Sequence, residues 1–351
     1  MKIHKDVMTM LGSRRKFAIA LSAAVVLALT ACSGASPAAP NEADGIRKQT
    51  LVFAHITAET FPYHDGALKF KELLEEATDG TITVDVFPGG QLGQERDINE
   101  SILEGSVHIG IAAGALATLA PIVNLNLLPF MIQDQQHMNR IIASKVGDQI
   151  AERISSEGGF HVVDYFSTGD SSIQSVGVAI THPSHMKGLK LRALENAALT
   201  DAMQTLGANP TPMPYGEIYT GVQSGVIEGA TLDWNSVLSM RLYELIDHAT
   251  APSAAFLAYP CPVIMSNEFW ESLNAAEQKV ISEAMTEAAD FQRKLFIEMK
   301  DEAVKEVIAT GLTITEIDQE AFVEALRPVW NKWAKKLGAE DILDTILSLR
   351  E

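Results

Sequence analysis

Residues 187–214 read KGLKLRALENAALTDAMQTLGANPTPMP, and this stretch decides the fold. A Lys-Gly turn precedes a short apolar strand at 189–192. A helix is predicted at 197–206 from the spacing of its apolar residues, and Gly207 is a typical residue to close it. A strand followed by a helix is the repeating unit of α/β proteins, so the stretch predicts an α/β fold.

The same alternation of strands and helices occurs on both sides of this stretch. The predicted strands are at 51–54, 81–87, 108–112, 160–166 and 230–232. The predicted helices are at 64–78, through Ile98 and Leu103, and at 218–225. The alternation predicts a parallel α/β sheet, and its restart after the middle of the chain predicts two lobes.

The last third of the chain is predicted to be helical. Apolar residues keep helical spacing over 276–310, which would give a helix of about 50 Å at 1.5 Å per residue. A helix of this length is longer than the diameter of most single compact domains, so we expect it to lie across both lobes. Gly311 ends it, and an edge strand at 312–314 and a last amphipathic helix at 322–337 are predicted after it.

The N-terminus has the pattern of an export signal. A basic cluster precedes an apolar run at 17–29, too short to span about 30 Å of hydrocarbon, and Leu-Thr-Ala-Cys ends at Cys32. This ending resembles the lipobox of bacterial lipoproteins, which implies that Cys32 takes a lipid; an ordinary signal peptide with an incidental Cys is the alternative. We therefore predict a lipoprotein signal peptide at 1–31, a flexible tether at 32–48 and a periplasmic, lipid-anchored protein.

Composition limits the partners of the chain. The net charge of the 351 residues is −18; residues 1–31 hold five Lys or Arg and one Asp, so the remainder carries −22. Such an acidic body is not expected to bind nucleic acid or an anionic membrane surface. Cys32 and Cys261 are the two cysteines, so a lipidated Cys32 leaves Cys261 without a disulfide partner.

No strong catalytic or metal-binding motif occurs in the sequence. HExxH, GxSxG and the phosphate-binding GxxxxGK[ST] are all absent, which argues against an enzyme and against a cofactor. His182 and His185 lie close together, but no Cys or carboxylate is near enough to complete a metal site. His55 and His64 are isolated in the sequence and fit structural roles.

Arg192 is the side chain whose position points to binding. It ends the strand at 189–192, and ligands of open α/β sheets bind beyond the carboxyl ends of strands. A guanidinium there matches the planar fork of a carboxylate. The alternative is a structural ion pair with an acidic residue such as Glu195.

The order of these motifs resembles a known family. The segments are KGLKLR at 187–192, LGANPTPMP at 206–214, EIYTGVQSGVIEG at 217–229, FPGGQLG at 87–93, LPF at 128–130 and FWESL at 269–273. They are similar to those of DctP-type solute-binding proteins of tripartite ATP-independent periplasmic (TRAP) transporters. The similarity covers nearly all of residues 49–337.

The resemblance implies a two-lobed periplasmic solute-binding fold with crossing strands and a long helix spanning both lobes. Lobe I would be residues 49–168 plus about 255–295, and lobe II residues 169–254 plus about 296–351. It further implies that Arg192 holds the carboxylate of a small organic acid between the lobes, and that membrane permease subunits of a TRAP transporter receive this ligand.

Two departures from the family bear on the ligand. Many members carry a second Arg about 20 residues before the position of Arg192, in a Gly-x-Arg context, whereas residues 167–172 here read STGDSS. Many members also have a Gln-Glu-Asn-Pro-like string where residues 230–235 here read ATLDWN. The missing cation puts a dicarboxylate in doubt. Asp170 and Asp233 bring acceptors instead, and Trp234 offers an aromatic face, although a turn residue and a core residue are the alternatives for Asp170 and Trp234.

We therefore predict a small monocarboxylate with hydroxyl, amino or aromatic groups. The alternatives are a small amine or amino alcohol, or a protein that serves a sensor rather than a transporter. The candidate ligand-binding residues are His55, Asp170, Ser172, Arg192, Glu195, Tyr215, Asp233 and Trp234.

Overall fold

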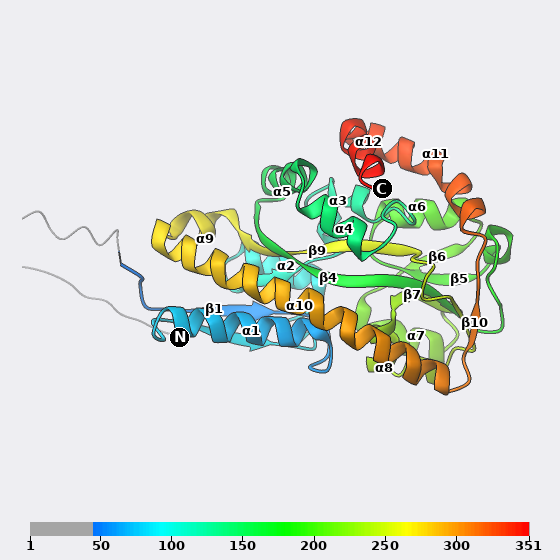
Figure 1. Ribbon diagram of the computed structural model, residues 1–351, viewed down its shortest axis with the longest axis horizontal. Helices are drawn as coiled ribbons and strands as arrows, with labels where there is room; N and C mark the ends of the chain where they lie inside the picture. The colour runs from blue at the N-terminus through cyan, green and yellow to red at the C-terminus, as the bar shows by residue number, and fades with distance from the viewer. Residues whose placement is uncertain (1–44, 351) are drawn as a thin grey trace, which may run out of the picture. The chain divides into compact units, whose positions relative to one another are not determined.

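A mixed sheet of ten strands runs through residues 45–350, the part of the chain that the computed structural model describes (Figure 1). Its strands are β1 Gln49–Ala54, β2 Ile82–Phe87, β3 Ile109–Ile111, β4 Phe160–Ser175, β5 Lys190–Ala193, β6 Asn209–Pro212, β7 Gly229–Asp233, β8 His248–Thr250, β9 Leu257–Ser266 and β10 Thr313–Thr315. The strand order is β2-β1-β3-β9-β4-β7-β5-β6, and β8 pairs with both β4 and β10.

The predicted parallel sheet occurs in two groups of strands but not between them, at the centre of the sheet. Strands β1, β2 and β3 are parallel, and so are β5, β6 and β7. Between these two groups, β9 is antiparallel to β3, and β4 is antiparallel to both β9 and β7. The chain passes from the first group to the second along β4 and returns along β9, so the two strands must run in opposite directions.

The described residues form twelve helices, six at positions that the sequence pattern predicted and six that it did not predict, one of them 14 residues long. They are α1 Pro62–Ala77, α2 Glu95–Leu103, α3 Val123–Asn126, α4 Gln135–Ile142, α5 Lys145–Gly158, α6 Ala197–Thr205, α7 Ile218–Gln223, α8 Trp234–Ser239, α9 Asn267–Ser272, α10 Ala275–Ala309, α11 Gln319–Leu337 and α12 Glu340–Ser348. The 35-residue α10 packs against α1, β4 and α8, and Figure 1 shows it passing from the side of β1 to the side of α8.

The apolar core is divided into two clusters, and α10 contributes to both. The larger cluster includes Phe53 of β1 and Phe296 of α10. The smaller cluster is built around Trp234 of α8 and is closed by Ala303 and Val307 of α10. The long helix therefore packs against both parts of the molecule, as the sequence predicted from its length.

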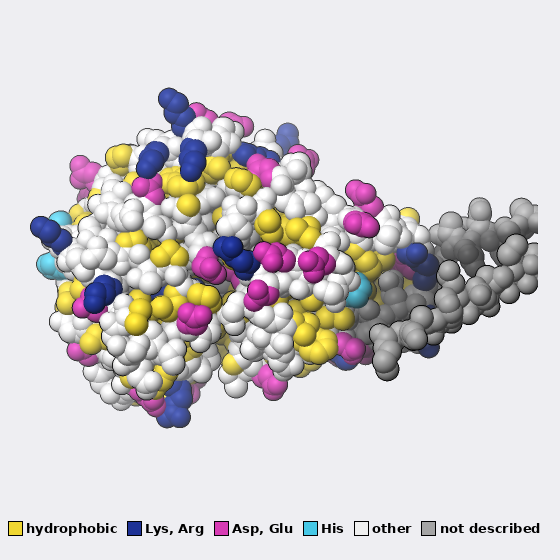
Figure 2. All heavy atoms as spheres, turned by 180° about the vertical axis from the view of Figure 1, so that it is seen from behind, with side chains coloured by type: hydrophobic (Ala, Val, Ile, Leu, Met, Phe, Trp, Pro, Cys, Tyr) yellow, Lys and Arg dark blue, Asp and Glu magenta, His cyan; other side chains and the backbone are white. Residues whose placement is uncertain are grey.

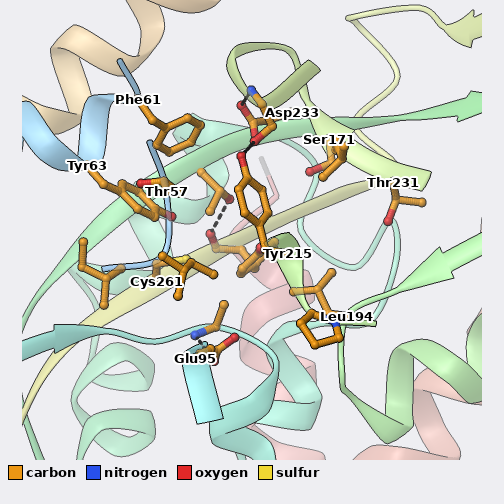
Figure 3. A pocket seen from close by; sticks show the side chains of 18 of the residues that line it. Thr57, Phe61, Tyr63, Glu95, Ser171, Leu194, Tyr215, Thr231, Asp233 and Cys261 are labelled. Carbon is orange, nitrogen blue, oxygen red and sulfur yellow. Dashed lines mark hydrogen bonds between the residues drawn. The ribbon is translucent and has the colours of Figure 1, made fainter. Parts of the chain in front are cut away.

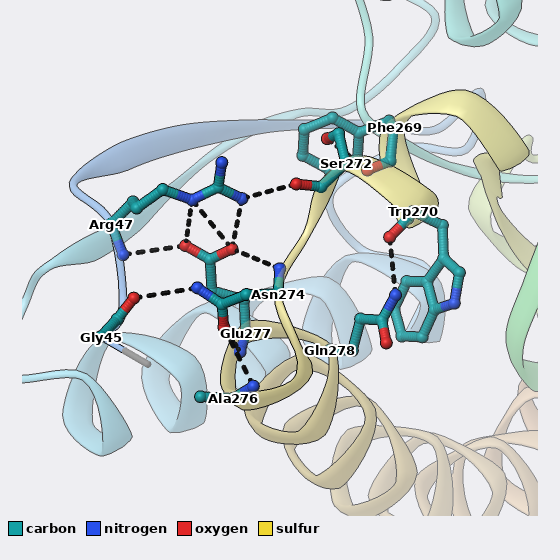
Figure 4. Close-up of polar contacts among 9 residues, drawn as sticks. All are labelled: Gly45, Arg47, Phe269, Trp270, Ser272, Asn274, Ala276, Glu277 and Gln278. Carbon is teal, nitrogen blue, oxygen red and sulfur yellow. Dashed lines mark hydrogen bonds and ion pairs between the residues drawn. The ribbon is translucent and has the colours of Figure 1, made fainter. Parts of the chain in front are cut away.

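The chain enters the fold at a fixed junction with the first turn of α10 (Figure 4). Glu277 is fully buried, and its carboxylate accepts from Nε of Arg47 at 2.9 Å and from the Arg47 backbone N–H at 2.8 Å. Asn274, the N-cap of α10, donates to the carbonyl of Gly45 at 2.9 Å. Burial alone would raise the pKa of Glu277, but the bonds from Arg47 and the Asn274 backbone outweigh it and lower the pKa.

On the face in Figure 2, Asp and Glu side chains are interspersed with Lys and Arg. Within residues 45–350, no helix is both long enough and apolar enough to cross a membrane. The predicted signal peptide at 1–31, Cys32 and most of the predicted tether lie outside the described residues.

Candidate ligand-binding site

A cavity lies between the two parallel parts of the sheet, where β4 and β9 cross (Figure 3). The space inside it that the centre of a water-sized sphere can occupy is about 70 Å³. One water needs roughly 10–15 Å³ by this measure, so the cavity suits a compact solute. Its polar lining side chains are His55, Thr57, Tyr63, Glu95, Thr168, Ser171, Arg192, Glu195, Tyr215, Thr231, Asp233, Ser236, Tyr259 and Cys261.

Arg192 enters this cavity from the carboxyl end of β5, as predicted. The side chain is 5% exposed, and its Nε donates to the carbonyl oxygen of Met213 at 3.0 Å. Burial lowers the pKa of the guanidinium, but an arginine remains charged at any physiological pH. Within the described residues, the terminal nitrogens have no hydrogen-bond partner and no ion pair within 4.0 Å joins Arg192 to Glu195. One end of the guanidinium is fixed and its other end is available to a solute.

Glu95 lines the cavity near Arg192 and was missed by the sequence analysis. It is the first residue of α2, and its Oε1 accepts the backbone N–H groups of Ala113, Ala115 and Leu116 at 2.6, 3.0 and 3.3 Å. Burial raises the pKa of Glu95 to about 7, although these bonds and the charge of Arg192 oppose the rise. The sequence held a signal for it, since Glu95 lies two residues after the end of the FPGGQLG motif.

Asp233 lines the cavity on the side opposite Glu95, with Tyr215 between them (Figure 3). It is the last residue of β7 and the N-cap of α8, where its carboxylate accepts the backbone N–H of Ser236 at 3.0 Å. The Ser236 hydroxyl also donates to Asp233 and accepts from the Tyr215 hydroxyl. Burial raises the pKa of Asp233 to about 6, against the opposing effect of the bonds from Ser236.

Two buried hydroxyls on the cavity wall have no partner in the described residues. They are the phenol oxygen of Tyr63, whose side chain is 6% exposed, and Oγ1 of Thr231, whose side chain is 2% exposed. Cys261 is a buried free thiol on the same wall, and burial raises its pKa. Buried polar atoms are rarely left unpaired, so unpaired hydroxyls at a cavity mark groups that a solute can satisfy.

His55 both lines the cavity and has protein partners. Its Nδ1 lies 3.1 Å from the Thr57 hydroxyl, and its Nε2 lies 3.2 Å from Nδ1 of His64. Burial and the neighbouring His64 lower the pKa of His55 to about 3, so the ring is neutral at physiological pH. The pair of histidines, isolated in sequence, is therefore joined in the fold.

Three of the candidate residues lie outside the cavity lining, which corrects their expected position. Asp170 forms an ion pair with Lys300 at 2.7 Å, and the Ser172 hydroxyl accepts from Nε1 of the fully buried Trp234 at 3.1 Å. Side chains alternate along a strand, so Ser171 faces the cavity while its two neighbours face away. A bulge between Ser167 and Asp170 sets which of them faces inward.

The paired histidines at 182 and 185 lie in a surface turn. Nδ1 of His182 contacts the hydroxyl of Ser184, and Nδ1 of His185 contacts the hydroxyl of Thr181. Within residues 45–350, no group of three or more His, Cys, Asp or Glu is arranged to hold a metal ion.

Comparison with known proteins assigns this architecture to a family. The model of the family described as "DctP: Bacterial extracellular solute-binding protein, family 7" matches residues 53–336. The chain belongs to the DctP family. It is thus a solute-binding protein and not an enzyme, in agreement with the prediction made from its missing catalytic motifs.

Relatives of the DctP family match nearly the full length of the fold. The C4-dicarboxylate-binding periplasmic protein of Rhodobacter capsulatus is 28% identical over 300 residues, covering 83% of this chain and 88% of that protein. A TRAP periplasmic solute-binding protein from Bradyrhizobium, solved with galacturonate, is 28% identical with a TM-score of 0.80, covering 86% of this chain and all of the other. A third, from Roseobacter denitrificans with bound L-galactonate, is 26% identical with a TM-score of 0.78, covering 88% of this chain and all of the other. The predicted two-lobed fold with its long helix, and membership of the TRAP solute-binding proteins, are confirmed.

Proposed function

We propose that this TRAP solute-binding protein captures a small monocarboxylate that carries hydroxyl, amino or aromatic groups. One observation carries the proposal: among the described residues, Arg192 is the only Lys or Arg that lines the cavity, and its outer nitrogens have no protein partner. A guanidinium in this state binds a carboxylate through two parallel hydrogen bonds. A second carboxylate would meet Asp233 and Glu95 rather than another cation.

The ligands of related proteins support an acid rather than an amine. Galacturonate and L-galactonate, bound to two of the structures described above, each have one carboxylate and several hydroxyls. The relative named for C4-dicarboxylates binds a different class. The lone cation of the present cavity favours the first class.

A panel of solutes tests the proposed class through thermal stability. We expect hydroxylated monocarboxylates to raise the unfolding temperature, since a solute that binds only the folded state adds about 2.7 kcal/mol at a hundredfold excess over Kd. Dicarboxylates and small amines should give no comparable shift. A shift with C4-dicarboxylates alone would sink the proposal, and a shift with amines alone would favour the amine alternative, with Asp233 or Glu95 as its partner.

We expect the two predicted lobes to face each other across the cavity, since segments of both line it. Tyr63, Glu95, Thr168 and Tyr259 belong to the segments predicted as lobe I, at 49–168 and about 255–295, whereas the segments predicted as lobe II supply Arg192, Thr231 and Asp233 among others. A solute that touches both walls shifts the protein toward its closed form. In the proposed function, this closed form is what the membrane permease subunits of the TRAP transporter receive.

We expect Cys32 to carry a lipid that anchors the protein in the membrane, because Leu-Thr-Ala-Cys ends the apolar run. Cys32→Ser should move the protein from the membrane fraction to soluble material or leave it uncleaved. Cys261→Ser is the matched control, since it removes the only other thiol of the chain, and this variant should stay with the membrane. Wild-type protein that is wholly soluble in its native host, with no lipid on its mature N-terminus by mass spectrometry, would disprove the anchor.

A further inference from the structure

Asp233 belongs to a patch of the cavity wall that holds acceptors and hydroxyls but no cation. Its cross-strand partner in β4 is Ser171, and Thr231 lies two residues earlier on β7, so the three side chains share one face of the sheet. Ser236 holds the Asp233 carboxylate in place through its backbone N–H and its hydroxyl. The carboxylate therefore faces the cavity in a fixed orientation.

This patch lies at a distance from Arg192 that a single small solute can bridge. Leu191 of β5 pairs with Gly229 of the parallel strand β7, which sets Arg192 level with the residue after Gly229. Asp233 comes three residues further along β7, or roughly 10 Å at 3.3 Å per residue. Arg192 and Asp233 both line the cavity, and the charges of both act on the phenol of Tyr215, so one six-carbon acid can reach each of them.

We propose that Asp233 and Thr231 recognise, by hydrogen bonds, a hydroxyl group at the end of the ligand away from Arg192. Asp233 also disfavours the binding of a second carboxylate at that end. The inference rests on the proposed function, in which Arg192 holds the first carboxylate. It adds a residue that decides which acids are accepted.

The hydrogen-bonding capacity of the patch distinguishes three possible ligand groups. A hydroxyl can donate to Asp233 and accept from Thr231, whose Oγ1 is unpaired in the described residues. An ammonium can only donate hydrogen bonds, so it would leave the hydroxyl donor of the cavity wall without an acceptor. A carboxylate can only accept, and it would place a like charge against Asp233 in a buried site, which is costly.

The rejection of a second carboxylate should weaken in acid, because a protonated Asp233 becomes a donor. Burial raises the pKa of Asp233 to about 6, so this change occurs below about pH 6. The groups near it are Tyr215 and Ser236, and its charge also acts on Tyr63, Tyr259 and Cys261. The charged groups in the cavity are Arg192, Glu95 and Glu195, and Glu95 also has a raised pKa, so the pH effect must be read against a variant that lacks Asp233.

Pairs of aldonate and aldarate test the inference, because they differ only in a terminal CH₂OH or carboxylate. Calorimetry at pH 8 measures the affinity for L-galactonate and galactarate, and for gluconate and glucarate. Each pair compares a terminal CH₂OH group with a second carboxylate. We expect the wild-type protein to prefer the aldonate at least tenfold, and Asp233→Asn to reduce this preference at least tenfold. Asparagine keeps the N-cap of α8, so the variant should fold. Thr231→Val should weaken aldonate binding several-fold.

The controls separate this inference from the proposed function. Asp170→Asn removes a carboxylate from β4 outside the cavity, and it should leave the aldonate preference unchanged. At pH 5 the wild-type preference should fall toward that of Asp233→Asn measured at the same pH, and it should fall further between pH 8 and pH 5 than the preference of the variant, in which only Glu95 titrates. An Asp233→Asn protein with the wild-type preference, or a wild-type protein that binds both acids equally, overturns the inference while leaving Arg192 in its role. Failure of every acid to bind the wild type overturns the proposed function and this inference together.

Discussion

Replacing Arg192 by lysine is expected to weaken binding of the carboxylate ligand at least tenfold. A hydrogen bond to a charged group contributes about 1.5–3 kcal/mol, and the guanidinium offers two of them in a fixed fork. Its Nε is already used by the carbonyl of Met213, which leaves the outer nitrogens for the solute. A lysine ammonium cannot hold Met213 and span both carboxylate oxygens at once.

Calorimetry with a hydroxylated monocarboxylate that stabilises the wild type measures this effect. Arg192→Ala should remove binding almost entirely, and unfolding curves of both variants should remain cooperative. Glu195→Gln provides the control, since Glu195 lines the cavity but forms no ion pair with Arg192 within the described residues. If Arg192→Ala binds as tightly as the wild type, Arg192 has a structural role and the cavity binds its solute by other groups.

Trp234→Ala should lower the free energy of unfolding by about 3–5 kcal/mol, because it empties a large volume in the smaller apolar cluster. Trp234 is fully buried, and its indole N–H donates to the Ser172 hydroxyl, which loses this partner in the variant. The side chain lies behind the cavity wall rather than in it. Urea denaturation followed by circular dichroism measures the loss.

Trp234→Phe separates stability from binding. It keeps most of the buried volume, so we expect a smaller loss of stability and an unchanged affinity for the ligand. A tenfold drop in affinity in this variant would show that the indole contacts the solute, as the sequence analysis considered. A loss of less than 1 kcal/mol in Trp234→Ala would contradict its role as a core residue.

The elements that were predicted from the sequence are those whose signal is local. The helix at 276–310 and the alternating strand at 81–87 were found because their apolar spacing is complete within the segment. Strand β9 was missed because Pro260 and Pro262 interrupt an otherwise apolar run, and prolines argue against a central strand. The second half of β4 was missed because residues 167–175 are rich in Ser and Thr rather than apolar.

A site residue could be predicted where it lies at the end of a strand. It was missed where only the direction of its side chain determines whether it lines the cavity. Arg192 was found from its place at the end of β5. Whether Asp170 or Ser171 faces the cavity depends on a bulge in β4, and no local pattern marks that bulge beyond Gly169 at a φ of 63°. Tyr63 and Cys261 come from strands and helices far apart in sequence, so only the folded chain shows that they share a wall.

The junction at Arg47 and Glu277 has a mechanical consequence. A pull on the chain ahead of residue 45 passes through the Arg47–Glu277 ion pair and the Asn274 bond before it reaches β1. The load is delivered to the first turn of α10 and spread along a rod of about 52 Å that packs against both α1 and α8. Force applied at the N-terminal side is therefore shared with α10, which packs against α1, β4 and α8, instead of acting on β1 alone.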